Sequence, residues 1–340
     1  MKVWSLGSDF YQSLLASVYD IFGISIWLGQ SFSIVFFAIS CVLLVWFAQA
    51  LRLNNVFIGL ALLLFGLLPS SLLFGSLTLR ETFMTAFLML GVYAAFSAIY
   101  ETHRQRQWKL YAWATVAFLA MGVFHMILLI YAIMISTLLF LVLYAQKASW
   151  QKTLVQMVVC SIGVGVLFVL VKEVLPVDLN DDYFAMLRIQ INGEVIPIPH
   201  AISVYHQSIN STGAATQYDA ALEFTSWGKM FLVFIYSYAF YLGWPVTGDY
   251  SQLSTWVLMA EAIFRLLGIV AIVLLARKNK QWYWLILVYI SLTFLWNIGT
   301  SNHGQALRHH FMTEWILVLG LLSYIQQYLK LDLPKKVSDE

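Results

Sequence analysis

Apolar runs of about twenty residues recur along this chain, from its first fifth to its C-terminal end. Roughly 20 apolar residues are what an α-helix needs to cross the hydrocarbon core of a bilayer. Lipid offers the backbone no hydrogen-bonding partners, so such runs span as helices. The pattern predicts a single membrane domain over 1–340, an all-α polytopic bundle of about nine spanning helices. The predicted spans are 25–50, 55–74, 82–100, 109–122, 124–145, 153–172, 253–276, 281–299 and 311–329.

The composition agrees with a membrane protein. Hydrophobic residues make up 61% of the chain and the mean hydropathy is +0.79, whereas a soluble domain stays near half apolar. The period of two that marks an outer-membrane barrel is absent. Cys41 and Cys160 both lie inside apolar runs, so neither a disulfide nor a metal site built from them is expected. The first residues are polar and mixed, without the apolar core of a signal peptide.

The distribution of charge predicts an orientation. Segment 174–228 carries six acidic residues against a single arginine, which places it outside as an extracytoplasmic insertion. By the positive-inside rule, short basic segments face the cytoplasm. The basic segments are 101–109, 147–152, 277–280 and 335–336.

These assignments agree with one another if 109–145 crosses twice and 229–243 is a re-entrant or interfacial helix, too short to span. The alternative has 109–145 crossing once and 229–243 spanning, and it would move two lysines outside. In the preferred topology, loop 301–310 and the Arg80-Glu81 pair share the outer face with 174–228.

Three of the chain's seven histidines stand beside an arginine between two apolar runs, in Asn302-His-Gly-Gln-Ala-Leu-Arg-His-His310. Cations at the edge of hydrocarbon are expensive to hold and mark a functional site for an anion, in a membrane most often a lipid phosphate. Arg308 would hold two phosphate oxygens, with His303, His309 and His310 as donors or proton carriers. The structural alternative is an ordinary loop whose histidines bond neighbouring helices.

Arg80 and Glu81 open the apolar run at 82–100. Thr78 and Glu81 have the spacing of a capping box, and an acid suits the positive end of a helix, so Glu81 has a structural explanation. The same dipole disfavours Arg80, which makes Arg80 a candidate for binding the substrate, with Glu81 beside it.

Two other polar positions in apolar helices have structural interpretations. Glu261 and Arg265 are four residues apart, so they share a helix face and are expected to pair with each other. His125 is expected to bond a neighbouring helix rather than to act in catalysis.

Near the N-terminus, an apolar face predicts an amphipathic helix on the membrane surface. Asp9 and Asp20 share its other face at a separation of about 16 Å, too far to act on one atom. Either could be a lone general base, or simply part of the solvated side. The apolar face comprises Phe10, Leu14, Leu15, Val18 and Phe22.

In their order along the chain, these pieces resemble the bacterial GT-C-type membrane glycosyltransferases, which use polyprenyl-phosphate-linked sugars. The resemblance covers most of the chain. Members carry a membrane helix before their first acidic outer loop, so we expect either a start upstream of Met1 or divergence at this end. The matching motifs are Asp9-x-Tyr11, Pro69-Ser70, Leu79-Arg80-Glu81, Ser211-Thr-Gly-Ala-Ala215, Gly243-Trp-Pro245 and Asn302-x-Gly-x-Ala-Leu-Arg-His309.

The resemblance implies an enzyme of cell-envelope polysaccharide biosynthesis, in the bacterial cytoplasmic membrane. A sugar would pass from a polyprenyl-phosphate donor to a glycan, lipid or protein acceptor. Asp9, and after it Asp20, would take the acceptor's proton, while Arg308, His309 and Arg80 would surround the phosphate. Membrane lipids are expected partners and nucleic acid is not. No cofactor is predicted, although a divalent metal stays open.

Two alternatives remain. An O-antigen-type polysaccharide polymerase or ligase also combines many helices, a large outer loop and Arg/His binding of lipid-linked glycan. A transporter or flippase of lipid-linked glycan is the non-enzymatic alternative. Transporters usually show repeated halves and broken helices at the bilayer midplane, and the sequence shows neither.

Overall fold

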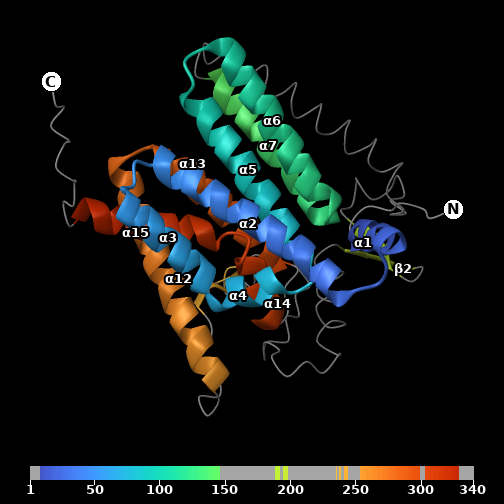
Figure 1. The fold of residues 1–340 in the computed structure, drawn as a ribbon. Helices are drawn as coiled ribbons and strands as arrows, with labels where there is room; N and C mark the ends of the chain where they lie inside the picture. The colour runs from blue at the N-terminus through green and yellow to red at the C-terminus, as the bar shows by residue number, and fades with distance from the viewer. Residues whose placement is uncertain are drawn as a thin grey trace.

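The computed structural model describes residues 8–145, 188–191, 194–197, 253–298 and 303–328, together with part of 235–243. This described part is helical except for one two-stranded ladder (Figure 1). The helices are α1 (Ser8–Phe22), α2 (Ile26–Ala50), α3 (Asn55–Leu67), α4 (Pro69–Ser76), α5 (Glu81–Tyr100), α6 (Arg104–Val123), α7 (Met126–Ala145), α12 (Leu253–Lys278), α13 (Gln281–Ile298), α14 (His303–His310) and α15 (Glu314–Tyr328).

Four described helices are long and apolar enough to cross a bilayer: α2, α5, α7 and α12. The pair α3 and α4, which bends by 66°, makes a fifth if it counts as one broken span. Large apolar side chains are exposed on the outer faces, among them Trp27 on α2 and Trp113 on α6. An apolar surface of this extent is typical of contact with lipid. The chain is therefore a helical membrane protein.

Not all of the other predicted spans are supported by the length and composition of the described helices. The run 109–145 does form two helices, α6 and α7, as the preferred topology requires. However, α6 opens on the polar stretch Arg104–Lys109, and α15 has only 15 residues, so length and composition alone do not qualify them. The predicted span 153–172, and all of 174–228 except the ladder, lie outside the described residues.

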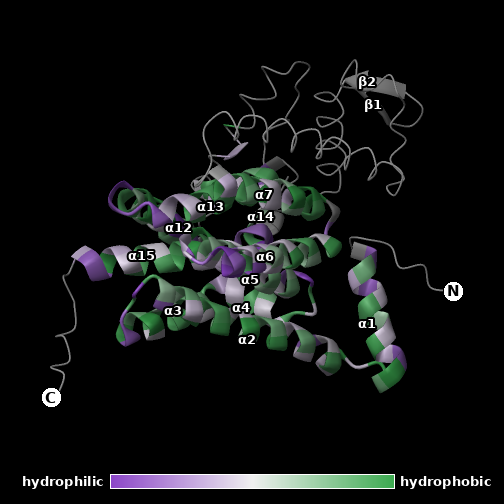
Figure 2. Cartoon of the chain, turned by 90° about the horizontal axis from the view of Figure 1, so that it is seen from above, coloured by the Kyte–Doolittle hydropathy of each residue, from purple (hydrophilic) through white to green (hydrophobic). Residues whose placement is uncertain are grey.

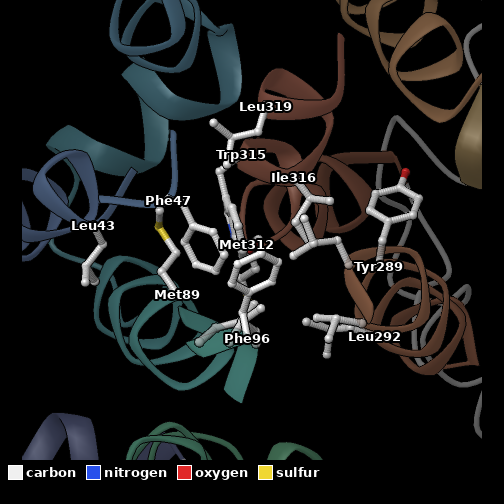
Figure 3. Close-up of a cluster of buried hydrophobic side chains, with 14 of the residues drawn as sticks. Leu43, Phe47, Met89, Phe96, Tyr289, Leu292, Met312, Trp315, Ile316 and Leu319 are labelled. Atoms are coloured by element: carbon white, nitrogen blue, oxygen red, sulfur yellow. The ribbon is translucent and has the colours of Figure 1, made fainter. Parts of the chain in front are cut away.

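The core lies where α2, α5, α13 and α15 meet (Figure 3). Aromatic and sulfur-containing side chains interlock there; the rings of Phe47 and Trp315 lie 5.0 Å apart between centroids. Hydrophobic residues cover most of the helices, and hydrophilic ones concentrate at helix ends and turns (Figure 2). The side chains at the centre of the cluster are Leu43, Phe47, Met89, Phe96, Tyr289, Leu292, Met312, Trp315, Ile316 and Leu319.

Small residues allow α12 and α15 to pack closely. A Cβ at Gly268 would lie 2.7 Å from the Cβ of Leu317, and one at Gly320 would collide with the side chain of Ile272. Association of helices in lipid depends on such close contact, because burial of apolar surface drives it only weakly. This contact fixes the start of α15, which carries a buried acid, Glu314.

Breaks in the helices determine where polar groups lie. Leu68 has φ −56° and ψ 135° because the following Pro69 disfavours a helical residue before it, and Pro69 then starts α4. The turn at Phe124-His125 joins α6 to α7. The two helices approach so closely that a Cβ at Gly122 would lie 2.6 Å from the Cα of Leu129, so only glycine fits there. The first break places the Ser70 hydroxyl beside Glu314, and the second places the Phe124 carbonyl beside Arg80.

The described residues also contain one short strand pair that the sequence analysis did not predict. Strand β1 (Arg188–Ile191) pairs antiparallel with β2 (Glu194–Pro197), with Ile191 opposite Glu194. The two residues between the strands, Asn192-Gly193, are the strongest short sequence signal for a tight hairpin. The prediction for 174–228 rests on its acidic residues alone and does not use this hairpin signal.

Candidate functional site

A buried ion pair joins Glu81, the first residue of α5, to Arg308 in α14. One oxygen of the Glu81 carboxylate accepts a hydrogen bond from Nε of Arg308 and forms an ion pair with its Nη2. Glu81 is 2% exposed and the Arg308 side chain 33%. The carboxylate therefore depends on this arginine, while the arginine keeps one edge open. The structure thus unites two of the motifs predicted to bind substrate.

Arg80 is the second cation of this cluster. Its Nε lies 3.9 Å from the same Glu81 oxygen, and its Nη1 donates to the carbonyl of Phe124 at 3.0 Å. Two guanidinium groups surround one carboxylate, which leaves a net charge of +1. The other oxygen of Glu81 is buried without a hydrogen bond within the described residues. We call Arg80, Glu81 and Arg308 the arginine cluster.

The capping-box interpretation of Glu81 was wrong. The residue before the helix is Arg80, with φ −71° and ψ −14°, and no side chain caps α5 at this end. Glu81 is held by Arg308 rather than by the backbone of Thr78. Its place in the first turn still suits the helix dipole. The spacing rule failed because a distant arginine offers a buried carboxylate a stronger, charged partner.

Three rings lie next to the arginine cluster. Trp296, near the end of α13, stacks on His309 with centroids 4.0 Å apart, and meets the His125 ring edge-on at 4.9 Å. Burial lowers the pKa of His125 to about 4, and the charges of Arg80 and Arg308 add to the shift. Burial, with Arg308 next, also holds the pKa of His309 well below its ordinary value. Both histidines are neutral at pH 7, so the arginines supply the positive charge.

Helix α1 docks on the same place through its aromatic residues. Phe10 packs on Phe124 at 5.4 Å, and Tyr11 packs on Phe83 at 5.5 Å. Asp9, the residue before this pair, is exposed. Asp20, eleven residues further on, is also exposed, near the far end of α1. Of the two predicted bases, Asp9 is thus the one next to the aromatic contacts with α5 and the α6–α7 turn.

The two remaining predicted site residues, His310 and His303, have different outcomes. His310 bonds the carbonyl of Tyr241 through Nε2 at 2.8 Å, and its ring lies 4.1 Å from that of Tyr241. It is 1% exposed, so it anchors α14 within the bundle. His303 begins α14, and its side chain lies outside what the structure describes. Figure 1 shows α14 beside α4, which connects the arginine cluster to a second polar network.

In this second network the expected pair of Glu261 and Arg265 is replaced by another. Nη2 of Arg265 lies 3.4 Å from Glu314, and its Nη1 donates to the carbonyl of Leu242 at 3.2 Å. The hydroxyl of Ser70, in α4, donates to the other oxygen of Glu314. Glu314 lies across the helix packing rather than along the helix, so spacing within α12 could not reveal it.

Sequence reasoning also missed Trp296, His125 and Glu314 as neighbours of the predicted site. His125 sits at a helix break, and Glu314 follows Arg308 by six residues inside an apolar run, so both carried a weak signal. Trp296 carried none. Within the described residues, no three His, Cys, Asp or Glu side chains are grouped to hold a metal ion.

Comparison of the chain with models of protein families, with curated proteins and with solved structures finds no match in any of the three.

Proposed function

We propose that this protein is an integral-membrane glycosyltransferase that transfers a sugar from a polyprenyl-phosphate-linked donor to a glycan, lipid or protein acceptor. The observation that carries the proposal is the arginine cluster, a buried carboxylate between two guanidinium groups with a net charge of +1. A polyprenyl phosphate linked to a sugar carries one negative charge in its phosphodiester, so this ligand would neutralise the cluster.

The geometry of Arg308 favours a phosphate as the ligand. Glu81 contacts Nε and Nη2, so it fixes the guanidinium plane, and no described residue accepts a hydrogen bond from Nη1. Arg80 is tied to the Phe124 carbonyl through Nη1 and sits at the N-terminus of α5. The positive end of a long helix adds to the attraction for an anion. Arginine serves here better than lysine because its planar fork matches phosphate oxygens.

The chemistry needs a base and a stabilised leaving group. The acceptor hydroxyl attacks the anomeric carbon, the bond from that carbon to the phosphate oxygen breaks, and polyprenyl phosphate leaves with the added negative charge. Arg308 and Arg80 offset this charge, and neutral His309 donates a hydrogen bond to it. Asp9 takes the proton of the hydroxyl. Asp9 is favoured over Asp20 because it stands next to Phe10 and Tyr11, at the end of α1 that contacts Phe124 and Phe83.

For the whole chain we propose nine crossings in the bacterial cytoplasmic membrane. Segment 229–243 is re-entrant or interfacial, and 174–228 is an extracytoplasmic insertion on the same side of the membrane as the arginine cluster. The division of 109–145 into α6 and α7 supports this count over the single crossing of the alternative. Donor and acceptor would then meet at the outer surface, where the phosphate of a polyprenyl chain lies at the hydrocarbon edge.

A binding and turnover assay tests the proposal. Purified protein in lipid nanodiscs is titrated with polyprenyl phosphate alone, the leaving group, so the unknown sugar does not matter. It is then incubated with polyprenyl-phosphate monosaccharides and, separately, with polyprenyl-diphosphate oligosaccharides, and released polyprenyl phosphate or diphosphate is measured. We expect saturable binding, and release with at least one donor. Binding without release from any donor would favour a transporter, and use of only diphosphate-linked oligosaccharides would favour a polymerase. Absence of binding removes the proposal.

A further inference from the structure

The network around Arg265 is the most buried polar assembly that the glycosyltransferase reaction leaves unused. It comprises Glu261 and Arg265 of α12 and Glu314 of α15, which are 2%, 3% and 1% exposed. Two carboxyl groups and one guanidinium group sum to a net charge of −1. A net charge enclosed in a helical bundle is strongly unfavourable, so some positive ion must balance it.

Glu261 lies one helical turn before Arg265 on α12, and Arg265 contacts Glu314 of α15, so the two carboxyl groups lie around the same guanidinium group. The charge of Glu261 acts on the Glu314 carboxyl. Yet both oxygens of Glu261 are buried without a donor in the described residues. Carboxylates that are both ionised can only accept, so no hydrogen bond can form between them. One proton placed between them creates a donor and removes one negative charge.

The rest of Glu314's surroundings are already committed. One of its oxygens accepts from Ser70 and the other faces Arg265. This leaves Arg265 as the partner of Glu314, so Glu261 is the carboxyl without a counter-charge. A proton shared between the two carboxyl groups would let Glu314 keep both its other partners.

A second observation points to the same place. Tyr289, on α13, is 2% exposed. Its hydroxyl has no hydrogen bond in the described part of the chain, and the charges of Arg265 and Glu314 act on it. It belongs to a different helix from either carboxyl. His310 of α14 also feels Arg265, but its Nε2 is bonded to the Tyr241 carbonyl.

We infer that Glu261 and Glu314 form a proton-binding site that holds one shared proton at neutral pH and so makes the buried network electrically neutral. A metal cation fits less well, because Arg265 already places a positive charge beside the carboxyls, and the described residues contain no group of three acidic, histidine or cysteine ligands. The site is separate from the arginine cluster and does not depend on the proposed transferase activity. As with other coupled carboxyl pairs, the proton belongs to the pair rather than to either residue.

Infrared spectroscopy of the full chain in nanodiscs tests this inference. At pH 7 the wild-type protein should show the carbonyl stretch of a protonated carboxylic acid, shifted in deuterium oxide and fading as the pH is raised. Glu261→Gln leaves one carboxylate and one guanidinium, so the band should disappear; Glu314→Gln should remove it as well. The matched control is Glu81→Gln, which should keep the band because Glu81 lies between two guanidinium groups and outside the pair of carboxyl groups.

Several outcomes would overturn the site. A wild-type protein without the band at pH 7 contradicts it directly, and this measurement needs no variant to fold. A band that survives in a folded Glu261→Gln protein assigns the proton elsewhere. A band that appears only when sodium and potassium are withdrawn would show that a metal cation, rather than a proton, balances the charge.

Discussion

Substitution of Arg308 should distinguish its contribution to the free energy of unfolding from its contribution to the binding of polyprenyl phosphate. In Arg308→Ala, the Glu81 carboxylate loses its main partner. Breaking a buried pair costs about 3–5 kcal/mol of unfolding free energy. Arg80 stays 3.9 Å from Glu81, an attraction of about 4 kcal/mol at an effective dielectric constant of 20. Since Arg308 is also a third exposed, we expect a loss at the low end, about 3 kcal/mol.

The second change, Glu81→Gln, completes the experiment. It removes the orphaned charge, so the double variant Glu81→Gln with Arg308→Ala should be more stable than Arg308→Ala alone. Donor binding should not recover, because the guanidinium remains absent. A charge-assisted hydrogen bond contributes about 1.5–3 kcal/mol, and 1.4 kcal/mol is tenfold in affinity. Arg308→Lys, which keeps the charge but loses one of two bonds, should weaken polyprenyl phosphate binding by about 10- to 150-fold, and Arg308→Ala by more.

The assays are thermal unfolding in nanodiscs and titration with polyprenyl phosphate. The matched control is Arg106→Ala: Arg106 is 74% exposed and paired with Glu101 at 3.2 Å, so both quantities should change little. A folded Arg308→Ala protein that binds like the wild type would refute the phosphate role. Binding restored by Glu81→Gln would show that Arg308 only offsets the carboxylate.

Three further predictions follow from the structure and the topology. Cysteines introduced at Ser211 and Ser301 should both be labelled from outside intact cells, and protection of either would overturn the proposed orientation. The double variant Arg265→Gln with Glu314→Gln should accumulate in membranes better than either single variant, as immunoblotting would show; a double variant worse than both would mean that each has another partner. Burial lowers the pKa of His125 in the folded chain to about 4, whereas the ordinary pKa of a histidine in the unfolded chain is about 6.5. Between these two values the unfolded chain binds a proton at His125 and the folded chain does not. The unfolding temperature should therefore fall as the pH drops from 7 to 4, and an equal fall in His125→Gln would remove this explanation.

The sequence singled out the charged residues that the structure brings together in the arginine cluster, but not how they pair. A charged side chain next to hydrocarbon is costly and therefore rare, so Arg80, Glu81 and Arg308 could be recognised as unusual from the sequence alone. The partners are set by packing between helices far apart in sequence, which local spacing rules do not contain. For that reason the rules for a capping box and for neighbours along a helix assigned Glu81 and Glu261 to nearby residues, whereas the structure gives Arg308 to Glu81 and Glu314 to Arg265.

Secondary structure was predictable to a similar depth. Apolar length located α2, α5, α7 and α12, because a helix that crosses lipid must satisfy its backbone internally. Breaks were harder to place. Pro69 divides a run that hydropathy presents as one span, and the resulting short helix α4 is what brings Ser70 to Glu314.

Helix ends explain why the charged side chains gather where they do. The last carbonyls of a helix lack partners within it, and in an apolar bundle they must find donors elsewhere. Arg80 donates to the carbonyl of Phe124 after α6, and Arg265 donates to that of Leu242. Each arginine uses part of its fork on the backbone and part on a buried acid. A guanidinium fixed at both points cannot turn away from its acid, so the broken helices prearrange the charges before any ligand arrives. Replacement of either arginine by lysine, which lacks the second edge, would keep the charge but lose this arrangement.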